Sequence, residues 1–455
     1  MIVRQYFVSG IAQSSYLVIG DKSCAVIDPS RDVDRYIRDA RKMGVSITHI
    51  FETHLHADFI SGHLDLAKAA GAEIVAPKAA GCSYPHIPVA EGDEIGIDDI
   101  QFRVIETAGH TPEHCCYVAT DTSRGDTPVA LFSGDMLFVG DVGRPDLFPG
   151  RAKELATRLF ENLHTKILAL PDECEVYPAH GKGSLCGRAM TAKRSTTIGY
   201  ERKYNYALQI HDRDAFIHAL TSGMPAAPDH FTRCSAINQR GPQLMQSLDP
   251  PVPLGPEQFQ ERVDKKDTVV LDVRGYPCFS GVHIPGAWNI DLAGNFATQA
   301  GWVLPQDQDI LIIAGHEQDV PEATLQLHRV GFDHVVGFLN GGMPAWAIQS
   351  LPVARVPVMS ADEAHTLVSA GKAILIDVRS SEEQQATPVE HAVPIPWHDL
   401  RTRHKELDPA THYILMCRGG SRASIAVSIL QMHGFSLVSN LAGGFEAYRR
   451  AGFVP

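Results

Sequence analysis

The sequence contains no apolar run that approaches the ~18 residues needed to span a bilayer, so no membrane-spanning helix is expected. Its first residues, MIVRQYFVSG, lack the apolar core and the small-residue cleavage site of a secretory signal peptide. Basic residues are also in deficit, because 40 Lys and Arg stand against 53 Asp and Glu, which gives a formal net charge of −13. A nucleic-acid backbone requires a basic face, so this charge argues against a nucleic-acid partner.

Cysteine is scarce and irregularly placed. There are 9 cysteines in 455 residues, an odd number without regular spacing. This pattern does not fit the disulfide framework of a small secreted domain. The expected location is therefore a reducing cytoplasm, with one or two of the thiols expected to be reactive.

The chain is too long for one hydrophobic core, and its pattern divides it into three expected domains. The first domain covers residues 1–245, and the proline-rich stretch SLDPPVPLGPEQ is interpreted as a linker after it. Residues 252–352 and 355–455 are related as an internal repeat, because VVLDVRG recurs as AILIDVRS and GFDHVVGFLNGGMPAW recurs as GFSLVSNLAGGFEAY. Each copy alternates short apolar strands with helical stretches, which predicts a parallel α/β domain.

Four predicted strands of residues 1–245 each end at a residue of a metal-ligating type. The strands are VSITHIFE, IQFRVIETA, PVALFSG and ECEVYPA, and the residues that follow them are His54-x-His56-x-Asp58, His110, Asp135 and His180. Ligands carried at the edge of a rigid sheet are held in a fixed geometry. Imidazole and carboxylate groups suit zinc or ferrous iron, so the set predicts a metal site.

Phe59 determines how many metals this site is expected to hold. The set resembles the metallo-β-lactamase fold, an αββα sandwich, whose two-metal members end the first motif with a histidine that binds the second metal. Phe59 stands at that position, and only Asp58 and His180 remain for a second ion. One metal is therefore expected. Two imidazoles and one carboxylate form the facial triad of Fe(II) oxygenases, but the residue types alone leave a one-zinc hydrolase open.

Three longer segments sharpen the resemblance. ETHLHADFISGH, SGDMLFVGDVGRPDL and YPAHGKGSLCG resemble the persulfide dioxygenase branch of this superfamily, and specifically its fusions with rhodanese domains. The resemblance implies one Fe(II) per chain, bound by His54, His110 and Asp135, although zinc accepts the same ligands. It further implies residues that orient ligands and water around the metal, namely His56, Asp58 and His180.

Two further residues of this domain are candidates for the site. Arg144, in GDVGRPD, is predicted to bind a carboxylate of the thiol substrate in a bidentate manner, with a structural role on its loop as the alternative. Cys186, in GSLCG, is predicted to hold or relay a persulfide near the metal, with burial as a small apolar residue as the alternative.

The last domain contains a predicted nucleophile, Cys417. In HYILMCRGGSRASIAVSIL a strand ends at this cysteine, a glycine-rich loop follows, and a helix begins near Ala423. Loop N–H groups, the helix N-terminus and the side chains of Arg418 and Arg422 are expected to stabilise a thiolate and a persulfide anion. The spacing Cys-x4-Arg is one residue shorter than the phosphate loop of tyrosine phosphatases, and the segment resembles rhodanese sulfurtransferases.

The first copy of the repeat is expected to lack this chemistry. Alignment of ILIIAG with YILMCR places Ala314 opposite Cys417, and the only cysteine of this copy, Cys278, lies in another loop. The following loop, GHEQDVPE, is acidic and has no arginine. We therefore predict an inactive spacer or docking domain.

Together these features predict an α/β multidomain enzyme of hydrogen sulfide detoxification. The resemblance implies that Fe(II) and O2 oxidise a glutathione, cysteine or coenzyme A persulfide to sulfite and thiol, and that Cys417 then transfers sulfur to sulfite, giving thiosulfate. Two alternatives stay open: a zinc thioester hydrolase like glyoxalase II, and a persulfide carrier or sensor. Neither a membrane nor a nucleic acid is an expected partner, and a homo-oligomer is compatible with the sequence.

Overall fold

The computed structural model describes residues 1–224, 226–265 and 267–454, which form two compact units. Unit 1 comprises Met1–Leu248 with His328–Gly331, and unit 2 comprises Asp249–Leu327 with Phe332–Pro455. Over the part of the chain that is described, no helix combines the length and the apolar character that crossing a bilayer requires.

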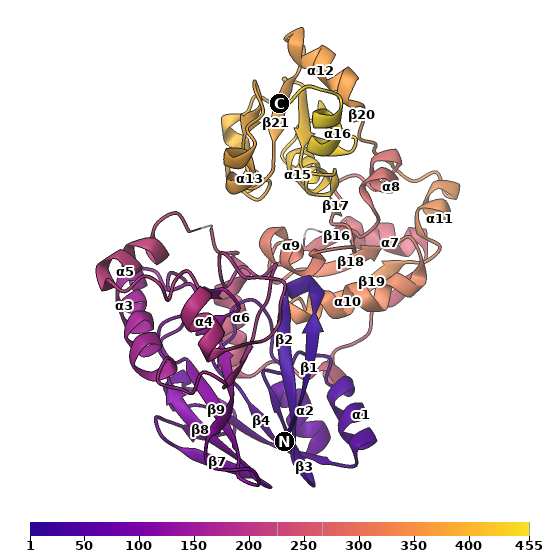
Figure 1. Ribbon diagram of the computed structural model, residues 1–455. Coiled ribbons are helices and arrows are strands. Elements are labelled where there is room, and N and C mark those ends of the chain that lie inside the picture. The colour runs from indigo at the N-terminus through magenta and orange to yellow at the C-terminus, as the bar shows by residue number, and fades with distance from the viewer. Residues whose placement is uncertain (225, 266, 455) are drawn as a thin grey trace. The chain divides into compact units, whose positions relative to one another are not determined.

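The described residues of unit 1 form two six-stranded sheets that pack face to face (Figure 1). The first has the strand order β1 (Ile2–Val8), β2 (Gln13–Ile19), β3 (Ser23–Ile27), β4 (Ser46–Phe51), β5 (Glu73–Pro77) and β6 (Ile87–Val89). The second has the order β14 (Thr196–Thr197), β13 (Glu175–Pro178), β10 (Pro128–Gly134), β9 (Cys115–Asp121), β8 (Ile100–Glu106) and β7 (Glu94–Ile97). A short ribbon, β11 (Leu137–Phe138) with β12 (Asp141–Val142), follows β10.

A buried apolar core lies between the two sheets, and helices cover their outer faces. The core joins Tyr16 and Phe51 of the first sheet to Phe102 and Phe132 of the second. The helices of unit 1 are α1 (Asp34–Met43), α2 (His63–Ala70), α3 (Ala152–Asn162), α4 (Ile198–Tyr204), α5 (Arg213–Thr221) and α6 (His230–Arg240). Residues of α1 and α2 share one outer core with the first sheet, and residues of α3 and α5 share the other with the second. This arrangement confirms the predicted αββα sandwich.

Unit 2 contains two five-stranded sheets in its described residues, and every strand pairing in them is parallel. The first has the order β15 (Val252–Leu254), β19 (Val335–Leu339), β18 (Asp309–Ile313), β16 (Thr268–Asp272) and β17 (Trp288–Asn289). The second has the order β20 (Val358–Met359), β24 (Val438–Leu441), β23 (Tyr413–Met416), β21 (Ile374–Asp377) and β22 (Val393–Pro394). The two orders correspond strand for strand, which confirms the predicted repeat of a parallel α/β domain.

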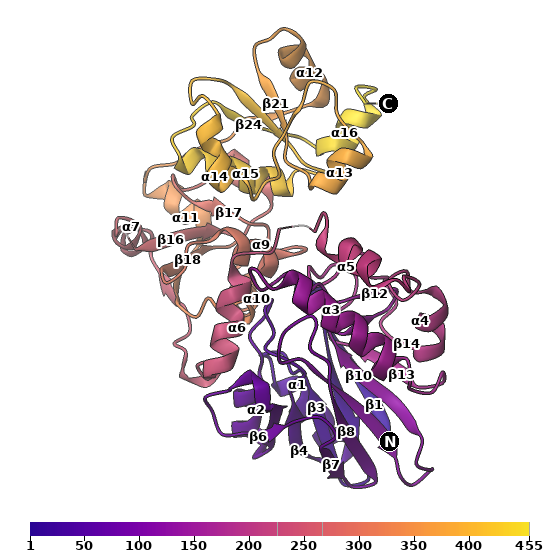
Figure 2. The same cartoon turned by 90° about the vertical axis from the view of Figure 1, so that its left-hand side faces the viewer.

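Helices accompany both sheets of unit 2 (Figure 2). In the first repeat they are α7 (Pro256–Val263), α8 (Tyr276–Gly281), α9 (Phe296–Val303), α10 (Val320–Arg329) and α11 (Gly342–Ile348). In the second they are α12 (Ala361–Ser369), α13 (Ser381–Ala386), α14 (Leu400–Arg403), α15 (Ser421–Met432) and α16 (Gly444–Arg450).

The proline-rich stretch SLDPPVPLGPEQ is not a simple linker, and neither is LPVARVPVMS, the stretch between the two copies of the repeat. Each contains a short strand, β15 in the first and β20 in the second, and each strand lies at the edge of its sheet. Proline is tolerated at a sheet edge because no strand lies beyond it to need the missing N–H. The interpretation of these stretches as linkers, which was based on their proline content, therefore missed one edge strand in each repeat.

Candidate metal centre and sulfur-transfer loop

Three strand ends of unit 1 bring His54, His110 and Asp135 together. His54 follows β4, His110 follows β8, and Asp135 follows β10. The Nε2 atom of His110 lies 3.2 Å from Oδ2 of Asp135, and the Nε2 atom of His54 lies 3.8 Å from the same oxygen. All three side chains are at most 2% exposed. The predicted triad is therefore one buried cluster with its ligand atoms facing one another.

The hydrogen bonds of this cluster suit a bound metal ion. His110 Nδ1 donates to the carbonyl of Arg144 at 2.9 Å, and His54 Nδ1 lies 2.9 Å from the Thr53 hydroxyl. Each histidine thus uses one ring nitrogen on the protein and leaves Nε2 facing the cluster. Both Nε2 atoms and Oδ2 of Asp135 are buried without a hydrogen-bond partner among the described residues. Such orphaned atoms are costly unless a cation occupies the space between them, so the donor set fits a divalent metal.

The protonation states in the cluster agree with metal binding. Burial lowers the pKa of His110, and burial together with the neighbouring His56 lowers the pKa of His54 well below its usual value. Although burial opposes the charged form of Asp135, the imidazoles of His180 and His110 hold the pKa of that carboxyl well below its usual range. Neutral imidazoles and an ionised carboxylate are the forms that bind a metal.

His180 links the cluster to Asp58, as its predicted orienting role requires. Its Nδ1 atom lies 2.7 Å from Oδ1 of Asp135, and its Nε2 atom lies 2.8 Å from Oδ2 of Asp58. Against the effect of burial, the two carboxylates raise the pKa of His180 well above its usual value. His180 thus bridges the carboxylates of Asp135 and Asp58.

His56 contacts two carboxylates that sequence analysis overlooked. Its Nε2 atom lies 3.1 Å from Asp28 and 3.8 Å from Glu52, and its ring lies 4.2 Å from that of His54. Asp28 also accepts hydrogen bonds from the backbone and hydroxyl of Thr53, next to His54. A signal for Asp28 was available, because it directly follows β3 in AVIDP, as the other ligand-type residues follow their strands.

Phe59 and Cys186 both lie near His180. The Phe59 ring is fully buried, 4.3 Å from the His56 ring and 6.3 Å from the His180 ring. Cys186 forms a second buried group with Asp58 and His180 whose ligand atoms lie within 4.8 Å of one another. Burial and the nearby carboxylates of Asp58 and Asp135 raise the pKa of the Cys186 thiol well above its usual value. Its predicted persulfide role stays a prediction and would begin from a neutral thiol.

Arg144 is buried and already holds a carboxylate of the protein. Its Nε and Nη2 atoms donate to the two oxygens of Asp146, both at 2.7 Å, and Nη1 donates to the carbonyl of Leu185 at 3.2 Å. Its carbonyl also accepts the hydrogen bond from His110. The alternative structural role therefore has direct contacts, while substrate binding stays a prediction that would require displacement of Asp146.

In unit 2, Cys417 lies between β23 and α15 at the turn predicted from the sequence. The thiol is 2% exposed, and its sulfur accepts a hydrogen bond from the Gly420 N–H at 3.1 Å. The Asn440 side chain donates to the Gly420 carbonyl at 3.1 Å, and the Phe445 N–H donates to the Cys417 carbonyl at 2.7 Å. The loop is thus held from a second segment, with an amide directed at the sulfur.

The two predicted arginines of this loop differ in their surroundings. Arg422 forms a two-pronged ion pair with Glu383, at 2.5 and 2.9 Å. Arg418 is 72% exposed and lies 3.6 Å from Glu446. Both charges are partly neutralised by these carboxylates. Against the effect of burial, the hydrogen bond to Glu383 and the charge of Cys417 raise the pKa of Arg422. The Gly420 amide contacts the sulfur directly. The capping pattern Ser380-x-x-Glu383 was visible in the sequence, but its link to Arg422 was not.

The first repeat keeps the pair of glycines beside the site but lacks the thiol. Ala314 directly follows β18 and lines a pocket of about 370 Å³ together with Gly315, His316, Gly341 and Gly342. Gly341 and Gly342 have positive φ angles of 73° and 58°, close to the 67° and 57° of Gly443 and Gly444 in the second repeat.

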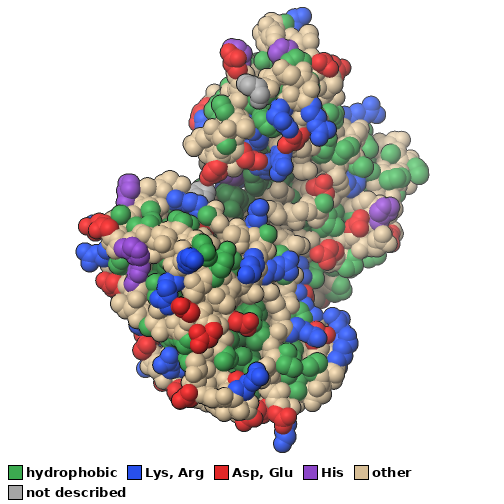
Figure 3. Space-filling view, in the orientation of Figure 1, with side chains coloured by type: hydrophobic (Ala, Val, Ile, Leu, Met, Phe, Trp, Pro, Cys, Tyr) green, Lys and Arg blue, Asp and Glu red, His purple; other side chains and the backbone are tan. Residues whose placement is uncertain are grey.

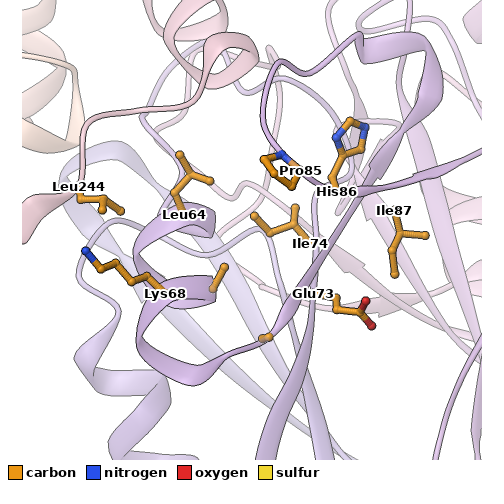
Figure 4. A pocket seen from close by; sticks show the side chains of 10 residues that line it. Leu64, Lys68, Glu73, Ile74, Pro85, His86, Ile87 and Leu244 are labelled. Carbon is orange, nitrogen blue, oxygen red and sulfur yellow. The ribbon is translucent and has the colours of Figure 1, made fainter.

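A separate pocket of unit 1 lies outside the predicted site. Its volume is about 630 Å³, and its lining includes Leu64, Lys68, Ile74, His86 and Leu244 (Figure 4). None of the triad residues lines it. On the face of the molecule drawn in Figure 3, Lys and Arg side chains are intermixed with Asp and Glu.

Comparisons with known proteins match both parts of the chain. Residues 8–180 match the metallo-beta-lactamase superfamily, and residues 255–349 and 360–451 match the rhodanese-like domain. A crystal structure of a metallo-beta-lactamase from Staphylococcus aureus is 35% identical, covers 74% of this chain and 98% of that chain, and has a TM-score of 0.67. A structure of ETHE1 from Myxococcus xanthus is 31% identical, covers 52% of this chain and 98% of that chain, and has a TM-score of 0.46.

Curated relatives are similar to the first part of the chain. The hydroxyacylglutathione hydrolase of Rhodospirillum rubrum is 38% identical over 160 residues, which are 35% of this chain and 57% of that protein. The chain spans 57% to 58% of the length of the first three curated relatives that it matches.

Proposed function

The chain belongs to the metallo-beta-lactamase superfamily and carries two rhodanese-like domains after that domain, and from this we propose that it oxidises persulfides and transfers their sulfur. In the proposed reaction, a low-molecular-weight persulfide, O2 and water give thiol, sulfite and two protons. Cys417 receives a sulfur atom from a second persulfide and passes it to sulfite, which gives thiosulfate. The proposal places both activities in the reducing cytoplasm.

One observation carries the proposal: a buried metal triad and a thiol held by a loop amide occur in one chain. His54, His110 and Asp135 would hold Fe(II), although zinc accepts the same donors. When bound, a ferrous ion supplies electrons and open coordination positions for reaction with O2. A product of this centre, sulfite, is a sulfur acceptor for the other site, so the two activities form a sequence.

The chain's own residues prepare the first site. The hydrogen bonds of His54 and His110 fix the tautomers that present Nε2, and His180 orients Asp135. Burial of all these groups limits the access of bulk water to the cluster. Phe59 adds an apolar wall where the second-metal ligand of two-metal members would lie.

A thioester hydrolase is the second candidate function. The curated relatives named hydroxyacylglutathione hydrolases support it over part of their length. Phe59 argues against it, because that chemistry normally uses a water molecule activated between two metals. Two zinc ions per chain would favour the hydrolase.

Metal analysis and O2 consumption of anaerobically purified protein test the proposal. The protein is loaded with Fe(II) and given glutathione, cysteine or coenzyme A persulfide in turn. We expect O2 uptake with at least one persulfide. The rate of O2 uptake should fall by at least about 100-fold in His110→Ala, because loss of a group that only orients a ligand already lowers activity or metal affinity by about 10–100-fold. His86→Ala, in the separate pocket, serves as the matched control. Absence of O2 uptake with all three persulfides would refute the dioxygenase assignment.

A further inference from the structure

The repeat without the cysteine reaches the loop that carries Cys417. Tyr276, the first residue of α8, lies against Gly420 of that loop. A Cβ atom placed on Gly420 would meet three carbons of the Tyr276 ring at 2.6 to 3.1 Å. Gly420 has a φ of 111° and donates its N–H to the Cys417 sulfur. The ring therefore occupies the space beside the residue that supports the nucleophile.

Tyr276 also reaches the second segment around Cys417. The Gly443 N–H donates to the Tyr276 hydroxyl at 3.5 Å, and the next residue, Gly444, packs against the Cys417 carbonyl. The hydroxyl accepts in this hydrogen bond, so its own hydrogen is available to an acceptor. Tyr276 thus contacts both segments that shape the sulfur-transfer loop.

Further contacts hold the two repeats together around α15, the helix that begins after the loop (Figure 2). The Ser424 hydroxyl donates to the Asn289 side chain at 2.6 Å, and the Asn289 N–H donates to Ser428 at 3.4 Å. Asn289, Ser424 and Ser428 are buried.

A second group of contacts joins the repeats through α14. Arg401 donates to the Trp302 carbonyl at 2.5 Å, and the Trp302 ring stacks on His398 at 4.2 Å. Together the two groups of contacts fix the position of Tyr276 relative to Cys417.

We propose that the first repeat completes the sulfur-transfer site, and that Tyr276 is a substrate-binding residue that selects a small oxyanion as the sulfur acceptor. This inference rests on the proposed function and concerns its sulfur-transfer half. The ring narrows the approach to Cys417 beside Gly420, and the hydroxyl hydrogen is donated to an oxygen of sulfite. A hydrogen bond to a charged group is stronger than one to a neutral group, so this donor favours an anion over a neutral thiol.

The step that Tyr276 would assist is the transfer of sulfur to sulfite. The sulfur atom of sulfite attacks the outer sulfur of the Cys417 persulfide anion and forms a new S–S bond. The original S–S bond breaks, and its electron pair stays on Cys417 as the thiolate. The products are thiosulfate and the free enzyme, with charge conserved and no proton transferred.

The test uses the full-length protein without O2, glutathione persulfide as donor and sulfite as acceptor, and measures thiosulfate. Tyr276→Phe removes only the hydroxyl, and we expect the KM for sulfite to rise about 10-fold or more with kcat little changed. The Cys417 persulfide detected by mass spectrometry should remain at the wild-type level. Tyr276→Ala also removes the ring beside Gly420 and should lower kcat as well.

Tyr413→Phe is the matched control. It also removes a hydroxyl that accepts a backbone hydrogen bond, but Tyr413 and its donor, the Asp408 N–H, both lie in the second repeat. A wild-type KM for sulfite in Tyr276→Phe, or an equal rise in Tyr413→Phe, overturns the role of Tyr276 while the sulfurtransferase proposal stands. Wild-type protein that forms no thiosulfate overturns the proposed function and the role of Tyr276 with it.

Discussion

At the scale of a single residue, the proposal of one metal ion per chain depends on Phe59. Its ring is fully buried and packs on His56, in the region where Asp58, His180 and Cys186 could form a second metal site. An imidazole at position 59 would add a nitrogen to this group without a large change in volume. The number of ligands available to a second ion therefore depends on this position.

Phe59→His is predicted to increase metal uptake above one ion per chain and to lower O2-dependent persulfide oxidation. The added imidazole supplies a further ligand, and a second ion would engage Asp58 and His180, which now orient Asp135. Metal content by elemental analysis and O2 uptake measure the two effects, with losses of about 10–100-fold in rate expected from a disturbed orienting shell. Phe59→Leu controls for lost packing. If Phe59→His leaves the metal content unchanged, Phe59 only fills space.

Residue types at strand ends predicted which side chains gather at the metal centre, but not what else those side chains contact. His54, His110 and Asp135 were predictable because each follows a predicted strand and is of a metal-ligating type, although β4 lies in the first sheet and β8 and β10 lie in the second. The bidentate contact of Arg144 with Asp146 was not, because a guanidinium binds a substrate carboxylate and a protein carboxylate equally well.

At the scale of the element, the Cys417 loop depends on close backbone packing between β23 and α16. A Cβ on Gly444 would lie 2.1 Å from the Cys417 carbonyl oxygen, at a φ of 57°. The equivalent Cβ on Gly342 of the first repeat would lie 3.4 Å from the Ala314 carbonyl. The packing is therefore tighter in the repeat that carries the thiol.

Gly444→Ala is predicted to abolish most sulfur transfer while O2 uptake in unit 1 continues. The added methyl group must displace the Cys417 backbone, in addition to the roughly 1–2 kcal/mol cost of a left-handed alanine. Gly434→Ala is the matched control, since Gly434 has a φ of 85° and nothing within 4 Å of its Cβ position. Thiosulfate formation and O2 uptake are measured on both variants. Equal sulfur transfer in the two variants would contradict the importance of this contact.

Glu383 links α13 to α15 and gives the second repeat a predicted pH dependence. Burial opposes the charged carboxylate, but the hydrogen bonds from Arg422 and from the Ser380 backbone lower its pKa to about 2. The folded-state pKa lies below the ordinary 4.5, so the carboxylate stabilises the fold above about pH 4.5. This contribution is lost as the pH falls toward about 2.

Glu383→Gln should therefore lower the thermal unfolding midpoint of the second repeat near neutral pH. Because the Glu383 side chain is 34% exposed, solvent screens the ion pair, and we expect a loss of at most about 1 kcal/mol. The difference between variant and wild type should shrink as the pH is lowered below about 4.5. A difference that stays constant with pH would assign the effect to packing instead.

At the scale of the whole molecule, the internal repeat and the periodicity of the strands predicted two parallel α/β folds in the second half of the chain, and the structure groups both of them in unit 2. Local patterns could not predict how the two repeats meet, because Tyr276 and Gly420 are far apart in sequence and neither is marked by a motif of its own. The repeat that lacks the cysteine was therefore interpreted as a spacer or docking domain, although its Tyr276 lies against the loop that carries Cys417.

Because the chain forms two units, removal of the metal should change the stability of one unit and leave that of the other as an internal control. All three proposed ligands lie in unit 1, and Cys417 lies in unit 2. Multidomain chains unfold in more than one step, so calorimetry of the full chain should show separate transitions. Ferrous ion at about 100 times its Kd stabilises the folded site by about 2.7 kcal/mol. At about 2–4 °C per kcal/mol for a domain of this size, chelation should lower the transition temperature of unit 1 by roughly 5–10 °C and leave that of unit 2 unchanged.

His110→Ala should remove this shift, since it deletes a ligand without changing unit 2. If chelation lowers both transition temperatures, metal binding is not confined to unit 1. If chelation changes neither transition temperature, the metal does not contribute to the stability of the folded protein.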